Sequence, residues 1–81
     1  MDRRVWRLGV RVNAVAVGPT DTPGTAVVPE VLQAVAATNT LRRTAEASEI
    51  ASAIVFLTSA DASYVNGAVL HATGGQRAIA A

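Results

Sequence analysis

The 81-residue chain is short, apolar and almost neutral: 51% of its residues are hydrophobic, 4% are aromatic, and the formal net charge is +1. This length allows one small domain at most, and so weak a charge gives no support for binding nucleic acid or an anionic membrane. The absence of cysteine excludes disulfides and thiolate chemistry and favours a reducing, cytoplasmic compartment. No apolar run approaches the roughly 20 residues needed to span a bilayer, so we expect no membrane segment.

Residues 1–9 carry three arginines and the only tryptophan, in a pattern typical of neither strand nor helix. We expect a poorly ordered leader here, with a basic arm as the alternative.

Val10 to Val17 is rich in β-branched residues and almost continuously apolar, which predicts a parallel strand covered on both faces. Gly18 and Pro19 end it, and a hydroxyl-rich loop follows (Thr20, Asp21, Thr22). Loops at the carboxyl ends of such strands are the usual ligand sites of open α/β sheets.

Two helices follow this loop. Proline in the first turn and valines at helical spacing predict a short helix from Pro29 to about Thr38. A second helix is expected from Glu46 to about Ser59, with an apolar stripe at i, i+3, i+4 and i+7 and acidic residues in its first turn. Ala68 to Ala72 reads as a second strand, and residues 76–81 as a tail.

This order predicts an α/β fold in which two parallel strands are joined by a crossover helix. A two-stranded parallel unit without helices on its other face is not expected to stand alone. Residues 10–75 therefore look like the end of a larger sheet, incomplete as a domain.

Three segments resemble the short-chain dehydrogenase/reductase family in the family's order and spacing. They are N-A-V-A-V-G-P-T-D-T-P (13–23), L-R-R-T-A-E-A-S-E-I-A (41–51) and F-L-T-S-A-D-A-S-Y-V-N-G-A-V-L-H-A-T-G-G (56–75). The resemblance is to the C-terminal third of that family's Rossmann-like parallel sheet: strand, lid helix, crossover helix, strand.

The resemblance implies a site for NAD or NADP on the loop. At the position of Thr20 the family pairs backbone groups with the nicotinamide carboxamide, and at the position of Thr22 a hydroxyl adds a hydrogen bond to the cofactor. The implied cofactor-binding residues are Gly18, Pro19, Thr20 and Thr22. Residues 23–40 correspond to the substrate loop and lid. Its apolar side chains suggest either a substrate wall or packing on the body (Val27, Val28, Val31, Leu32, Val35).

Several residues depart from the family pattern. Val17 stands where the family has proline, Thr73 where it has aspartate, and Ala45 and Ala47 where it has glycine and proline. These departures concern the geometry of the loop and the anchoring of the last strand. Arg42 and Arg43 leave three interpretations open: contact with a cofactor phosphate or acidic substrate, a solvated position, or capping of a nearby carbonyl.

The residues of the family's chemistry do not occur in this chain. The family uses a tyrosine acid/base with a lysine four positions later, but Tyr64 is the only tyrosine, Ala68 follows it at that spacing, and there is no lysine. The six glycines do not form the dinucleotide fingerprint. His71, the only histidine, has no companion ligands for a metal. We therefore assign no catalytic and no metal-binding residue, and we expect Tyr64 to be a packing residue.

Three hypotheses remain. The first is a truncated NAD(P)-dependent oxidoreductase that supplies the nicotinamide-side loop and substrate lid, does not catalyse alone, and works as a homo-oligomer or with a complementing chain. The alternative is a non-enzymatic oligomerisation or interaction module that uses the last strand and the crossover helix. The third is a chain without a selected function.

Overall fold

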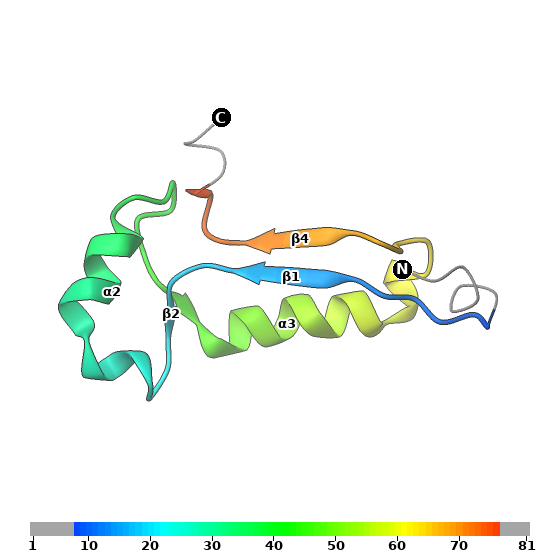
Figure 1. The fold of residues 1–81 in the computed structure, drawn as a ribbon, viewed down its shortest axis with the longest axis horizontal. Helices are drawn as coiled ribbons and strands as arrows, with labels where there is room; N and C mark the ends of the chain where they lie inside the picture. Colours follow the sequence, from blue (N-terminus) through cyan, green and yellow to red (C-terminus); the bar gives the residue numbers. More distant parts are fainter. Residues whose placement is uncertain (1–7, 77–81) are drawn as a thin grey trace.

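The computed structural model describes residues 8–76, so most of the expected leader and tail lies outside the described residues. Two parallel strands lie side by side with a helix along one face, and a second helix lies beyond their carboxyl ends (Figure 1). In chain order the elements are β1 (Ala14–Val17), β2 (Thr20–Asp21), the 3-10 turn η1 (Thr25–Val27), α2 (Pro29–Ala36), β3 (Ala45–Glu46), α3 (Ala47–Thr58), the 3-10 turn η2 (Ala60–Ala62) and β4 (Val69–Ala72).

The predicted parallel pair is confirmed. β1 pairs with β4 in parallel, with Ala14 opposite Val69 and Val17 opposite Ala72. The arrows of both strands point the same way, and α3 returns along them in the opposite direction, as a crossover helix must (Figure 1). The described residues therefore form an α/β unit.

The first strand is shorter and less covered than its sequence predicts. Its ladder begins only at Ala14, because Asn13 turns its side chain to the chain before β4: Nδ2 donates to the carbonyl of Val65 (3.1 Å) and Oδ1 accepts from the amide of Ala68 (2.9 Å). Val17 is 51% exposed. The expectation of burial on both faces is wrong for the described chain, because α3 covers one face and no second layer lies on the other.

Both ends of α3 are satisfied by side chains. At its start Glu46 and Glu49 form a reciprocal capping box. At its end the guanidinium of Arg11 donates to the carbonyl of Leu57 (2.9 Å), one of the last carbonyls of the helix, and to that of Ser59 (3.4 Å), which also accepts from the amide of Ala62 (3.1 Å). The periodicity of α3 is confirmed, but of its large apolar side chains only that of Leu57 is buried.

The apolar core of the described residues is small. It consists of Ala36, Leu57 and Ala62, while many larger apolar side chains lie exposed. Within residues 8–76, no helix is long and apolar enough to cross a membrane.

Candidate functional site

The loop of residues 18–22 leaves the carboxyl end of β1 and is tied to two neighbouring segments. The amide of Gly18 donates to the carbonyl of Ala72 at the end of β4 (2.9 Å). The carbonyl of Pro19 accepts from the amide of Ala45 (2.9 Å), and Thr20 and Asp21 then pair in parallel with Ala45 and Glu46 as the short β2–β3 ladder. The four residues predicted to bind a cofactor therefore lie on one segment held from both sides.

Gly18 lies against the backbone that follows β4. A Cβ built on Gly18 would be 2.7 Å from the Cα of Thr73 and 2.9 Å from its carbonyl oxygen. No real Cβ fits at that distance, so glycine is needed here for close approach of two backbones.

Threonine hydroxyls fix the second half of the loop. The hydroxyl of Thr20 donates to the carbonyl of Gly18 (2.9 Å). Thr22 and Thr25 bind each other reciprocally: the amide of Thr22 donates to Thr25 Oγ1 (2.8 Å), and the amide of Thr25 donates to Thr22 Oγ1 (3.2 Å). Thr25 Oγ1 also lies 2.8 Å from the carbonyl of Thr20. Sequence reasoning missed Thr25, although its i, i+3 spacing from Thr22 is typical of side-chain-stabilised turns.

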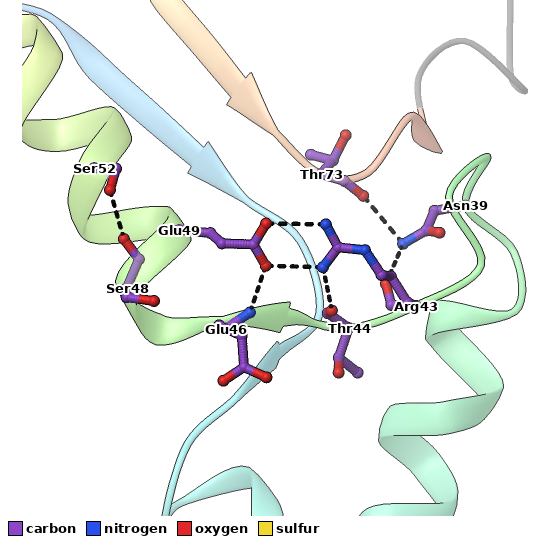
Figure 2. A network of polar contacts seen from close by, with 8 residues as sticks. All are labelled: Asn39, Arg43, Thr44, Glu46, Ser48, Glu49, Ser52 and Thr73. Atoms are coloured by element: carbon purple, nitrogen blue, oxygen red, sulfur yellow. Dashed lines mark hydrogen bonds and ion pairs between the residues drawn. The ribbon is translucent and has the colours of Figure 1, made fainter.

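Asn39 is a second residue that the sequence did not single out. Its side chain is buried, at 2% exposure, in the segment between the two predicted helices. Nδ2 donates to the carbonyls of Arg43 (3.1 Å) and Thr73 (3.3 Å), and Oδ1 accepts from the amide of Arg42 (2.6 Å). Figure 2 shows the amide between the chain before β3 and the chain after β4.

Arg43 is engaged within the protein. Its guanidinium makes two parallel hydrogen bonds to the carboxylate of Glu49 (2.8 and 2.9 Å) and donates to the carbonyl of Thr44 (3.1 Å) (Figure 2). The structure thus shows the capping interpretation for Arg43. The hydrogen bond from Arg43, followed by that from the amide of Glu46, lowers the pKa of Glu49 to about 2.

A cavity of about 150 Å³ lies beneath the loop, with Pro19, Ile50, Ala72 and Thr73 among its lining residues. Ligand pockets for whole small molecules usually occupy about 300–1,000 Å³. The cavity alone is therefore too small to enclose a dinucleotide.

Tyr64 and His71, the only tyrosine and the only histidine in the sequence, do not belong to the loop site. Tyr64, expected to be a packing residue, is fully exposed in the turn after η2, so that expectation is wrong. His71 is exposed on β4 opposite Ala16. Among residues 8–76, no three acidic, histidine or cysteine side chains lie close enough together to hold a metal ion.

The lid valines do not pack on the body in the described structure. Val27 is 79% exposed and Val31 60%, and Val28 and Val35 are exposed as well. Only Leu32 of this group is half-buried.

Comparison with known proteins identifies the family. A family model described as enoyl-(acyl carrier protein) reductase matches residues 3–77. The chain is 47% identical over 72 residues to cis-4-hydroxycyclohexanecarboxylate dehydrogenase of Sinomonas cyclohexanicum, covering 88% of this chain and 29% of that protein.

Solved structures agree. A short chain dehydrogenase/reductase family protein superposes with a TM-score of 0.81 at 43% identity, covering 93% of this chain and 30% of that one. The angucycline C-6 ketoreductase LanV, whose structure was determined with bound NADP, superposes with a TM-score of 0.79 at 34% identity. The match covers 91% of this chain and 29% of LanV. The chain thus spans less than a third of the length of these relatives. With its α/β crossover unit and the loop at the carboxyl end of β1, the chain belongs to the short-chain dehydrogenase/reductase family.

Proposed function

We propose that this chain acts as the C-terminal part of an NAD(P)-dependent short-chain dehydrogenase/reductase. It supplies the nicotinamide-side loop (Gly18, Pro19, Thr20, Thr22) and the substrate lid, and it does not catalyse by itself. Its reaction class is transfer of a hydride between a nicotinamide cofactor and a hydroxyl or carbonyl substrate. LanV and the Sinomonas dehydrogenase, one a ketoreductase and the other a dehydrogenase, support this class.

The observation that carries the proposal is the fixed backbone of the loop. Bonds from Gly18 to β4 and from β3 to Pro19 hold it at the end of β1. A carboxamide presents both a donor and an acceptor, and a preorganised backbone satisfies both without further ordering. The residues of the loop would hold the nicotinamide end by such contacts, and the cofactor would supply the hydride chemistry.

The lid residues fit an apolar substrate. Val27, Val28 and Val31 are exposed on consecutive turns next to the loop, where a substrate facing the nicotinamide would remove them from water. Apolar lining with few polar groups is the usual composition of small-molecule sites.

A further polypeptide segment would supply the catalytic groups. Within the described chain, β1 pairs only with β4, so its other edge is open. A hollow of about 620 Å³ lies between the segment leading into β1 and the end of α3, with apolar lining residues (Val12, Val15, Ile54, Leu57) beside polar ones (Arg11, Asn13, Thr58). An open strand edge next to a partly apolar hollow fits another strand and its covering layer. We propose that this is where the part with the tyrosine and lysine docks.

A chimera tests the proposal. Residues 9–75 would replace the matching segment of the Sinomonas dehydrogenase, and oxidation of cis-4-hydroxycyclohexanecarboxylate would be followed with NAD and with NADP. Measurable turnover together with cofactor binding is expected, because the segment brings a competent loop. The isolated chain should show no turnover. A folded chimera that binds neither cofactor would refute the proposal.

The alternative remains an oligomerisation or interaction module. In its favour, Ile54, Val55 and Phe56 on α3 and Val69 on β4 are 45–63% exposed. Sedimentation of the purified chain distinguishes the two: discrete oligomers that bind neither NADH nor NADPH would favour the module. A complex formed only with a chain carrying the catalytic pair would favour the oxidoreductase.

A further inference from the structure

We infer that Asn39 is a positioning residue for the 18–22 loop, whose role as a cofactor loop rests on the function proposed above. One buried amide side chain holds both backbone segments between which that loop lies. The hydrogen bonds of its side chain go to residues outside the loop, so Asn39 acts through Thr73 on one side and Arg43 on the other.

The first connection runs through Thr73. Nδ2 of Asn39 donates to the carbonyl of Thr73, and the Thr73 backbone lies at van der Waals contact with Gly18. Moving Thr73 by a few tenths of an ångström would therefore move Gly18 or open a gap beside it. The residue after Thr73 also packs tightly against Asn39, because a Cβ on Gly74 would lie 2.7 Å from Asn39 Nδ2.

The second connection runs through Arg43. Nδ2 of Asn39 also donates to the carbonyl of Arg43, two residues before Ala45. Ala45 binds Pro19 and pairs with Thr20. The bond to Arg43 thus fixes the start of β3, the strand against which the loop pairs.

The hydrogen-bonding capacity of the amide is used almost in full. Its two N–H groups serve the two carbonyls and its oxygen accepts from the amide of Arg42. A buried polar group satisfied in this way specifies one arrangement, since any other leaves buried groups unpaired. Two main-chain bonds reinforce it, from Leu41 to the carbonyl of Gly74 (3.0 Å) and from Arg42 to the carbonyl of Asn39 (3.2 Å).

Amide hydrogen exchange on the full chain tests the inference without requiring cofactor. Asn39→Ala should speed exchange of the Gly18 and Ala45 amides at least tenfold more than exchange of the Gly67 amide, which binds Val12 at the other end of the strands. The matched control is Asn66→Ala, which removes the acceptor of the Val12 amide. This control variant should leave the exchange rates of the Gly18 and Ala45 amides unchanged. A uniform rise across the chain, or no rise at Gly18 and Ala45, would overturn the positioning role.

If Asn39→Ala does not fold, hydrogen exchange on the unsubstituted chain still tests the positioning role. At low denaturant the amides of Gly18, Leu41 and Ala45 should open with the same free energy and the same denaturant dependence, as one unit. Opening of Gly18 independently of Leu41 and Ala45 would overturn the inference.

The link to function is tested separately in the chimera. There Asn39→Ala should weaken NADPH or NADH binding about tenfold, and Asn66→Ala should not. Unchanged affinity with a loosened loop would refute the functional link while leaving the exchange result intact. Absence of cofactor binding before any substitution would instead count against the proposed function.

Discussion

Gly18 and Thr73 are 55 residues apart in the chain, yet a Cβ on Gly18 would lie only 2.7 Å from the Cα of Thr73. This contact places the start of the 18–22 loop directly on the chain that leaves β4. It connects the predicted binding loop with the last strand through backbone atoms of both segments.

Gly18→Ala is expected to destabilise the chain by about 1–3 kcal/mol, because the added methyl forces two backbones apart. Chemical denaturation measures the change. Gly24→Ala is the matched control: its Cβ would meet its nearest neighbour at 3.7 Å, and its backbone is right-handed helical. That variant should be neutral or more stable by about 0.4–1 kcal/mol. Equal effects of the two substitutions would contradict the close packing of Gly18.

Arg42→Gly is expected to stabilise the chain. Arg42 has a φ of 54°, a left-handed conformation that costs most residues about 1–2 kcal/mol. Glycine adopts it freely but has more freedom in the unfolded chain, so the net gain should be about 0.5–1 kcal/mol. The control is Arg43→Gly, which removes the pair with Glu49 and should destabilise. A lower denaturation midpoint for Arg42→Gly would show that the strain is absent.

Acid is expected to lower the stability of the folded chain through protonation of Glu49. Its pKa is lowered from 4.5 to about 2 in the folded chain, so its contribution is fully present above about pH 4.5. The contribution is lost as the pH falls toward 2, because the unfolded chain then binds more protons. Denaturation midpoints measured between these pH values should fall less steeply for Glu49→Gln. Glu30→Gln, in the exposed first turn of α2, is the matched surface substitution. An unaltered slope for Glu49→Gln would contradict the assignment.

Leu57→Ala should abolish the cooperative melt of the chain. Leu57 is the only large apolar side chain in the core of the described residues, and removing such a side chain costs about 2–5 kcal/mol. Val55→Ala, two residues away and 63% exposed, should change the free energy of unfolding by less than about 0.5 kcal/mol. Circular dichroism melts compare the two. Similar melts for both variants would mean that α3 does not pack through Leu57.

Local patterns predicted β1, α2, α3 and β4 to within about four residues but missed the short β2–β3 ladder, because residues 20–22 were expected to be loop and Glu46 to begin the helix. The apolar run before Gly18 gave β1, although its first residues turned out to bind through the side chains of Arg11 and Asn13 instead of continuing the ladder. The stripe ending at Leu57 predicted α3, and the acidic residues of its first turn proved to be its cap. Periodicity could not show that most of this stripe lies exposed, because exposure depends on what else packs against the helix.

The sequence by itself determined the order of strand, loop, helices and strand, and it determined the family, through the spacing of three motifs along the chain. These properties depend on neighbouring residues, whose periodicity and turn chemistry act locally. Only the tertiary structure decided that Gly18 lies on Thr73, that Asn39 joins Thr73 to Arg43, and that Arg43 binds Glu49. The contacts of Gly18 and Asn39 with Thr73 join residues at least 34 positions apart, where the identity of one residue carries no signal of its partner until the parallel strands bring them together.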